Sequence, residues 1–498
     1  MQQVTPQIIL GIILGYFLLL IIISRFTSKN SDNRTFFNAN KNSPWYLVAF
    51  GMIGASLSGV TFISIPGVVG AGGTNMAFSY MQMVYGYLVG YFVIATVLMP
   101  VYYKYNLTTI YGYLGERFNV YAYKTSAGFF ILSRVAGSAF RVYLVALVLD
   151  SFVFAPMGLS FNFTVAMTII LIWVYTYKGG IKTIVITDTL QTFFMLSAVI
   201  ATIIIIGGEM QLNPFEIIST IRESEYSRMW FFDKAWADPN NFFKQFISGA
   251  LIALVMTGLD QDMMQKNLTC RNLRDAQKNM FTFSVSLVVT NMLFLGLGAL
   301  LYIFATKQGL EIPAKTDQFY PTIALQHLPP LVGVLFVVGL IAAAYSSADS
   351  ALTALTTSFC IDFLDFEKKG RSESQKKKTR MLVHLGFSVL LMAVIIVFHY
   401  LNNEAIINSL FKAAGYTYGP ILGLFAFAIL TSRDLPGLAT LIVCLMAPVI
   451  SWILDANAAA LLNNFQFGNM IIALNGLITF AGLWLISKKP NYEPGIAN

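Results

Sequence analysis

The sequence GMIGASLSGVTFISIPGVVGAGG, residues 51–73, is apolar enough to cross a membrane, yet glycines, hydroxyl side chains and a proline interrupt it. Each glycine costs about 1 kcal/mol of helix propensity, and Pro66 removes a backbone donor. Since unpaired backbone groups in hydrocarbon must find partners, a broken helix survives only where it is buried in protein or lines a wet cavity. Unwound carbonyls beside small hydroxyls bind Na+ and polar solutes in transporters. A Gly/Ser-rich helix-packing face is the alternative interpretation.

The composition of the whole chain excludes a soluble protein. Its 498 residues are 56% apolar and only 11% charged, and the mean hydropathy is +0.67. Apolar runs of about 20 residues, long enough to cross a bilayer, recur along the sequence. We therefore predict an all-α membrane protein with about thirteen spans. These lie near residues 5–24, 46–69, 76–102, 126–153, 160–177, 184–208, 243–264, 280–306, 331–363, 381–400, 405–431, 435–455 and 468–486.

The charges of the loops predict the orientation in the membrane. Most Lys and Arg residues fall in every second loop, which marks the cytoplasmic side. These loops lie within residues 25–41, 104–124, 178–182, 266–278, 368–380, 433 and 488–489. We expect a multi-pass plasma-membrane protein with its N-terminus outside and its C-terminus in the cytoplasm. The first apolar segment lacks a basic leader and a small-residue cleavage site, so it is predicted to be a retained span. The net charge of +8 follows from this topology and gives no reason to expect nucleic acid.

The segments between the spans are short. Residues 209–242 and 307–330 are expected outside, and the charged run from Lys368 to Arg380 is expected to be a solvated cytoplasmic linker, with lipid-headgroup contact as the alternative. No segment is large enough for an enzyme domain, and no phosphate-binding glycine loop is found. The sequence therefore predicts a secondary transporter, not an enzyme or an ATP-driven pump.

Two arginines lie inside one predicted span. Arg134 and Arg141 are two helical turns apart, so they share a face. A guanidinium in a span can bind an anionic or hydroxyl-rich solute through two hydrogen bonds. The alternatives are pairing with a buried carboxylate or extension to the membrane surface.

Other charged groups near or inside spans have more than one interpretation each. Asp188 is either a cation ligand or an anionic cap at the start of its helix. Lys412 either neutralises Asp349, attracts an anionic solute or extends outward. The polar residues 260–265 either make cytoplasmic gating contacts or solvate a helix end.

The segment GLIAAAYSSADSALTALTTSFCID, residues 339–362, gathers hydroxyls around Asp349. The hydroxyl residues are Ser346, Ser347, Ser350 and Thr353. Hydroxyls in a span often bond to their own backbone four residues back. A set of hard oxygen donors, however, also suits Na+ rather than a soft metal.

Several of these strings together resemble the sodium/solute symporter family, which includes sodium-coupled sugar, sialic acid, proline, monocarboxylate and iodide transporters. The resemblance covers roughly residues 45–430. It rests on ASLSGVTFISIPG at 55–67, LTTIYGYLGERF at 107–118, KGGIKTIVITDTLQ at 178–191, LDQDMMQKNLTCRN at 259–272 and YSSADSALTALTTSFCID at 345–362.

The resemblance implies a LeuT-type core of two inverted five-helix repeats around a central site. The implied parts are an extra helix and loop at 1–44, the first repeat at 45–208, an external loop at 209–242, the second repeat at 243–431, and two further helices with a short tail at 432–498. A sodium site is implied at the carbonyls of Gly54 and Leu57 and the hydroxyls of Ser346 and Ser347. A second sodium site is implied at Asp188, Asp349 and Ser350.

The resemblance also implies a solute site. The positions that match sialic-acid-type members are Ser56, Ser58, Thr61, Phe78 and Gln82. The family's arginine aligns near Gly137, between Arg134 and Arg141, so either arginine is a candidate for a carboxylate-bearing solute.

We therefore expect a monomeric Na+-coupled symporter that imports a small organic solute by alternating access. Sialic acid, a sugar acid, a monocarboxylate and a sugar are the solute classes in view, with Na+ as the co-transported ion and the lipid bilayer as the surroundings. The alternatives are proton coupling, with Asp349 or Asp188 as the carrier, and a solute sensor on the same scaffold, which is expected to carry a large signalling domain.

Overall fold

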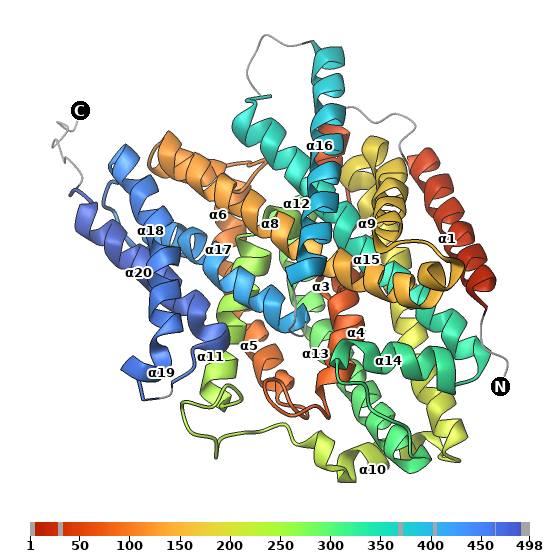
Figure 1. Cartoon of the computed structure of the whole chain (residues 1–498). Helices are drawn as coiled ribbons and strands as arrows, with labels where there is room; N and C mark the ends of the chain where they lie inside the picture. Colours follow the sequence, from red (N-terminus) through yellow and green to blue (C-terminus); the bar gives the residue numbers. More distant parts are fainter. Residues whose placement is uncertain (1–4, 28–32, 367–371, 402–405, 464, 490–498) are drawn as a thin grey trace, which may run out of the picture.

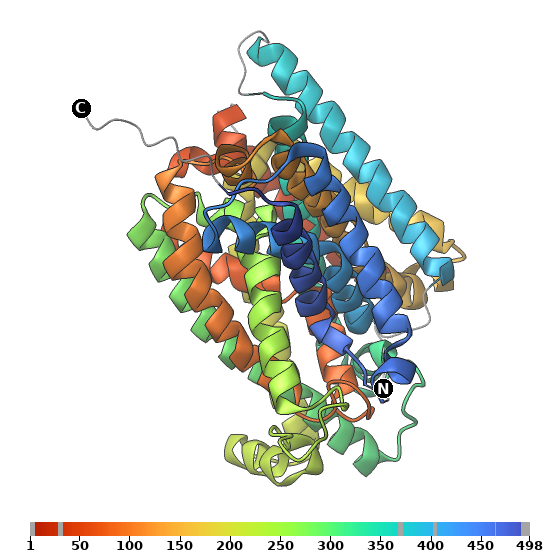
Figure 2. The same ribbon diagram turned by 90° about the vertical axis from the view of Figure 1, so that its left-hand side faces the viewer.

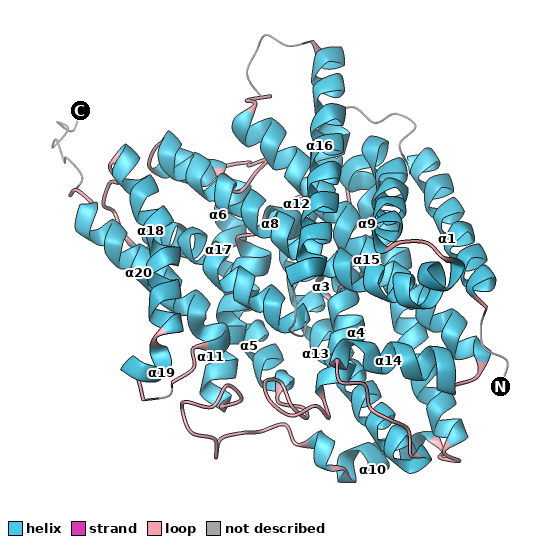
Figure 3. Ribbon diagram, in the orientation of Figure 1, coloured by secondary structure: helices cyan, strands magenta, loops and turns pink. Residues whose placement is uncertain are grey.

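The computed structural model describes residues 5–27, 33–366, 372–401, 406–463 and 465–489. In this part of the chain the fold is a bundle of helices joined by loops (Figures 1 and 3). The long helices in the first half are α1 (Pro6–Thr27), α3 (Trp45–Ser56), α4 (Gly59–Val68), α5 (Tyr80–Val93), α6 (Met99–Lys104), α8 (Val120–Leu149) and α9 (Phe161–Glu209). The second half supplies α11 (Phe242–Ala253), α12 (Gln261–Asn267), α13 (Leu273–Gln308), α15 (Pro330–Ser358), α16 (Glu373–Leu401), α17 (Ile406–Leu430), α18 (Gly437–Ala456) and α20 (Ile471–Ile486).

The helices of this described part agree in place with the thirteen expected spans. Ten are long and apolar enough to cross a membrane, and two further pairs do so if each bent pair counts as one span. The remaining expected span corresponds to the shorter apolar helix Phe161–Tyr177. The count of ten to twelve confirms a multi-pass all-α protein, while a crossing by Phe161–Tyr177 stays a prediction.

The stretch that opened the sequence analysis is a broken helix. α3 ends at Ser56, α4 begins at Gly59, and the two are bent by 54°. Gly54, in the last turn of α3, lies directly against α9. A Cβ added there would lie 2.3 Å from Thr192 Oγ1, so a larger residue would push the two helices apart.

A second interruption divides α9. Gly180 has φ +56° inside the helix, a conformation that residues with a side chain avoid. An added Cβ at Gly180 would also lie 2.5 Å from the Phe36 ring. The second part of α9 therefore begins at Gly180, well before Asp188. The expectation that Asp188 could cap a helix start is wrong, because the chain is already helical there.

The broken helix lies at the centre of the bundle, against α8, α13 and α15, and α1 packs against α9 (Figure 1). α18 and α20 pack beside α17 at the edge. The first and last described residues lie toward opposite ends of the molecule (Figure 2).

The charged run before α16 is not a simple solvated linker. Residues 368–371 lie outside the described residues, but α16 begins at Glu373 and includes the rest of the run. Arg380 is buried, with its guanidinium 4.1 Å from the centre of the Phe36 ring. From Glu373 onward the run is helical and not a linker, although its side chains up to Thr379 are exposed or half-buried as expected; the burial of Arg380 is the other departure.

Candidate functional site

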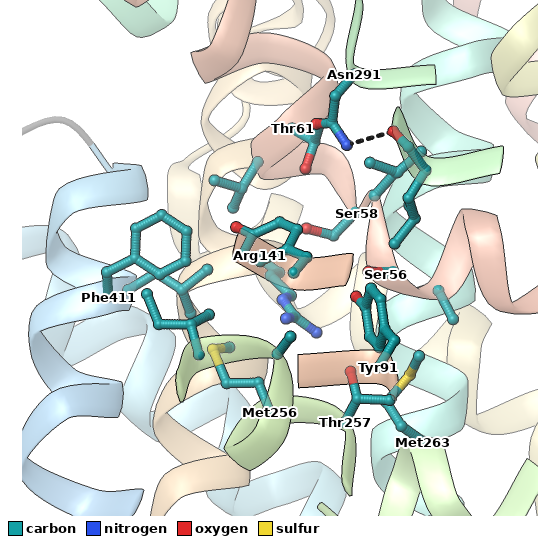
Figure 4. A pocket seen from close by; sticks show the side chains of 18 of the residues that line it. Ser56, Ser58, Thr61, Tyr91, Arg141, Met256, Thr257, Met263, Asn291 and Phe411 are labelled. Carbon is teal, nitrogen blue, oxygen red and sulfur yellow. Dashed lines mark hydrogen bonds between the residues drawn. The ribbon is translucent and has the colours of Figure 1, made fainter. Parts of the chain in front are cut away.

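A cavity opens beside the break between α3 and α4 (Figure 4). Hydroxyls from the break, the inner faces of α5, α8 and α13, and the ends of α11 and α17 line it. The cavity volume is about 70 Å³, which holds a few waters. Its polar and aromatic lining includes Ser56, Ser58, Thr61, Tyr80, Tyr87, Tyr91, Arg134, Arg141, Thr257, Asn291 and Phe411.

Arg141 places its guanidinium in this cavity, between Ser56 and Phe411 (Figure 4). The side chain is 6% exposed. Among the described residues no carboxylate lies within ion-pair distance of it, and its Nε has no hydrogen-bond partner. Burying a charge without a partner is costly, and a guanidinium without a carboxylate can pair with an anionic ligand.

Arg134 is neutralised by the protein itself. Its guanidinium forms an ion pair with Asp262 and lies 3.7 Å from Asp260 Oδ2. The Tyr418 hydroxyl also donates to Asp260. The sequence left open which arginine is paired with a carboxylate. In the described residues Asp260 and Asp262 lie beside Arg134, and no carboxylate pairs with Arg141. The polar residues 260–265 are buried, so helix-end solvation is wrong for them.

The candidate sodium ligands converge on the break. In the described structure no N–H or O–H donates to the carbonyl of Gly54 or of Leu57. Ser347 Oγ, on α15, lies 3.4 Å from the carbonyl oxygen of Ala55. The Ser346 hydroxyl, also buried on α15, has no hydrogen-bond partner among the described residues. The interrupted helix thus supplies free carbonyls at Gly54 and Leu57, while on α15 the Ser347 hydroxyl donates to the Ala55 carbonyl and the Ser346 hydroxyl is unpartnered. These are hard oxygen donors that suit Na+.

The hydroxyls on α15 divide into two groups. Thr356 and Thr357 donate to the backbone carbonyls four residues before them, as hydroxyls in a span commonly do. Ser346, Ser350 and Thr353 make no such bond and have no partner in the described structure. The backbone-bonding interpretation is therefore wrong for the serines near the break.

The candidate second-site residues lie together, with a lysine among them. Asp188 Oδ2 is 2.7 Å from the Nζ of Lys266, on α12. Asp349 accepts hydrogen bonds from the Tyr175 hydroxyl, at 2.9 Å, and from the backbone N–H of Ser350, at 2.5 Å. All of these side chains are buried. No group of three or more His, Cys, Asp or Glu side chains suited to a metal was found in the described residues.

Lys412 does not neutralise Asp349. Its side chain is exposed, and the lysine whose charge acts on Asp349 is Lys266. The position of Lys412 inside a predicted span allows this pairing as one of three alternatives. Lys266 was passed over because it falls just beyond the end predicted for the span 243–264.

Phe78 and Gln82 do not line the cavity. The Gln82 side chain donates to the Asn240 carbonyl and accepts from the Phe231 N–H, so it holds the segment before α11 in place. The Phe78 N–H donates to the Arg228 carbonyl of the same segment. Their role in solute binding stays a prediction.

The cavity also includes residues that the sequence did not single out. Tyr80, Tyr87 and Tyr91 occupy one face of α5, and Asn291 comes from α13. Three tyrosines at spacings of seven and four residues place phenol groups on one helical face, a signal that was available in the sequence.

Comparison with known proteins identifies the family of this chain. The family model described as "Sodium:solute symporter family" matches residues 36–435. The sodium/sialic acid symporter SiaT of Proteus mirabilis is 25% identical over 94% of this chain and 94% of its own length. The mouse sodium-coupled monocarboxylate transporter 1 is 26% identical over 77% of this chain and 62% of its own length.

A solved structure confirms the LeuT-type fold. It is the substrate-bound, outward-open state of a Na+-coupled sialic acid symporter. It matches with a TM-score of 0.81 and 19% identity, covering 97% of this chain and 99% of that one. Because the family model covers most of the sequence and the fold agrees with it, the chain belongs to the sodium:solute symporter family, whose members are transporters and not enzymes.

Proposed function

We propose that this symporter couples the entry of Na+ to the import of a small organic solute that carries a carboxylate. The observation that carries the proposal is the Arg141 guanidinium, which lies in the cavity beside the broken helix and has no carboxylate partner among the described residues. An arginine binds a carboxylate through two parallel hydrogen bonds, which fixes both charge and orientation. The relatives named for sialic acid and for monocarboxylates transport solutes of this kind.

Na+ binds between α3 and α15 in this proposal. Its ligands are the carbonyls of Gly54 and Leu57 and the hydroxyls of Ser346 and Ser347, with the Ala55 carbonyl close by. This assignment is supported by the missing hydrogen-bond partners at the Gly54 and Leu57 carbonyls. The same break also carries the Ser56 and Ser58 side chains toward the cavity. An ion that fixes the break therefore raises the affinity for solute, and the solute must raise the affinity for Na+ equally.

The solute lies against Ser56, Ser58 and Thr61, with its carboxylate on Arg141. A cavity of about 70 Å³ is far below the 300–1,000 Å³ of a typical ligand site. The solute therefore enters with an opening of the surrounding helices, as alternating access requires. Phe78 and Gln82 contribute at the outer entrance, after the segment that Gln82 holds has moved.

We place the N-terminus outside, the C-terminus in the cytoplasm and the chain in the plasma membrane as a monomer that binds no nucleic acid. The loop charges support this orientation. Reporter fusions at residues 25–27 and 228–240 should report opposite sides of the membrane. Reporters on the same side would contradict the topology.

The test of the function is a panel of solutes presented to the purified chain with Na+ or with choline. Sialic acid, short monocarboxylates and neutral sugars form the panel, and thermal unfolding is the readout. The proposal expects stabilisation by an acid, only in Na+, and none by its neutral amide. Equal stabilisation by acid and amide, or stabilisation independent of Na+, would contradict it. Uptake that follows pH at constant Na+ would favour proton coupling instead.

A further inference from the structure

A buried cluster of charges lies next to the proposed sodium site. Asp188 comes from α9, Asp349 from α15 and Lys266 from α12. The side chains of Lys266 and Asp188 are 2% and 1% exposed, and Nζ to Oδ2 is 2.7 Å. The ion pair therefore joins α12 to α9, and Asp349 on α15 lies near enough for both charges to act on it.

Helix α15, which carries Asp349, also carries oxygen donors suited to a monovalent cation. Ser346 lies next to Asp188, and the buried hydroxyls of Ser350 and Thr353 lack hydrogen-bond partners among the described residues. Two carboxylates and several free hydroxyls are hard donors of the kind that hold Na+. The position that such a cation would take beside Asp188 is occupied by the Lys266 ammonium.

The charges balance with a single sodium ion. Both Asp349 oxygens accept hydrogen bonds, as those of an ionised carboxylate do. With both carboxylates ionised, as the proposal assumes, Asp188 and Asp349 carry two negative charges. Lys266 and one Na+ at Ser346 and Ser347 supply two positive charges. A second Na+ would leave an uncompensated positive charge in the interior, which is costly.

We propose that Lys266 is a tethered cation that takes the place of a second sodium ion, so that the transporter binds one Na+ per cycle. This inference rests on the proposed function, because it assumes that one Na+ binds at the break between α3 and α4. Lys266 lies on α12, the inner half of the second bent helix pair. The permanent cation thus comes from a segment that the transport cycle is expected to move.

Na+ binding to the purified full-length chain tests the inference without knowledge of the solute. The probe is radioactive Na+ alone, with choline chloride to hold ionic strength constant. The wild type should bind one Na+ per chain with simple saturation. Lys266→Ala should bind two, because the vacated carboxylate recruits a second ion. Lys266→Arg, which keeps the charge, should bind one.

Two further variants identify where each ion binds. Adding Asp188→Asn to Lys266→Ala should return the number of bound Na+ ions to one per chain, since it removes the carboxylate charge that recruits the second ion. Two Na+ ions in the wild type would overturn the inference, and that result does not depend on any variant folding. A single Na+ in a folded Lys266→Ala variant would also overturn it.

If the proposed function is wrong, the same Na+ binding measurements give a different result. No Na+ bound by the wild type, or one Na+ that survives the change of both Ser346 and Ser347 to Ala, contradicts the sodium site itself. A wild type that binds two ions, of which that double change removes at least one, contradicts only the role of Lys266.

Discussion

The two interrupted spans of this transporter differ in what happens to the backbone carbonyls that lose their helical donors at the break. The break between α3 and α4 bends by 54° and leaves the Gly54 and Leu57 carbonyls without donors in the described structure. The break before α12 bends by 68°, but there the carbonyls are satisfied. The Tyr102 hydroxyl donates to the Gly258 carbonyl at 2.8 Å, and the Tyr111 hydroxyl donates to the Leu259 carbonyl at 3.1 Å.

The charged side chains near the two breaks differ in the same way as the carbonyls. At the second break Asp260 caps α12, accepting from the N–H groups of Asp262 and Met263, and Arg134 balances the acidic pair. Arg141, two turns along α8, remains without a carboxylate in the cavity beside the first break. One break is completed by the protein's own groups, whereas the other keeps the free carbonyls that we propose for Na+ and the arginine that we propose for the solute.

Changing Arg134 to Gln should have the largest effect on stability. It leaves Asp260 and Asp262 buried without their cation, and removing one partner of a buried ion pair costs about 3–5 kcal/mol. We expect a markedly lower midpoint of thermal unfolding in detergent. An unchanged midpoint would show that the second break does not depend on its own charges.

Changing Arg141 to Gln should instead act on solute binding. The loss of a charged partner for a carboxylate costs about 2–3 kcal/mol, or about 30- to 150-fold in affinity. The thermal midpoint without solute should stay the same or rise, because an unpaired buried charge is removed. Arg134→Gln is the matched comparison, measured with the acid that stabilises the wild type. Equal losses of solute affinity and stability in both variants would abolish the distinction between the two arginines.

Changing Tyr102 to Phe should have a smaller effect. The Gly258 carbonyl loses its donor, which costs about 1–3 kcal/mol of stability for a buried group. The Na+ concentration that half-saturates stabilisation should not change, since this break holds no ion. Weakened Na+ binding in this variant would mean that the second break contributes to the sodium site.

Much of this arrangement was predictable from local sequence. Glycines, hydroxyls and Pro66 in an apolar run predicted the first break, and the spacing of the arginines predicted that they share a face. The tertiary pairings were not predictable in the same way. Lys266 meets Asp188 because α12 bends under α9, and neither residue's own surroundings in the sequence indicates this contact.

Two wrong expectations have local physical causes. Asp188 was a candidate helix cap because the span was thought to begin near residue 184, yet the positive φ of Gly180 allows the helix to begin earlier. The pairing of Lys412 with Asp349 is one of three alternatives that its depth in a span allows, and it is wrong because the side chain is exposed on α17. Depth along a helix was predictable from the sequence, but rotation about its axis was not.

Na+-dependent uptake by reconstituted vesicles, with Ser346 and Ser347 both changed to Ala, tests the central claim most directly. The solute is the acid that stabilises the wild type, and Thr356→Ala is the control because its hydroxyl bonds only to nearby backbone and to His384. The account predicts that an inward Na+ gradient drives uptake in the wild type and the control but not in the double variant. Gradient-driven uptake that persists in the double variant would contradict it.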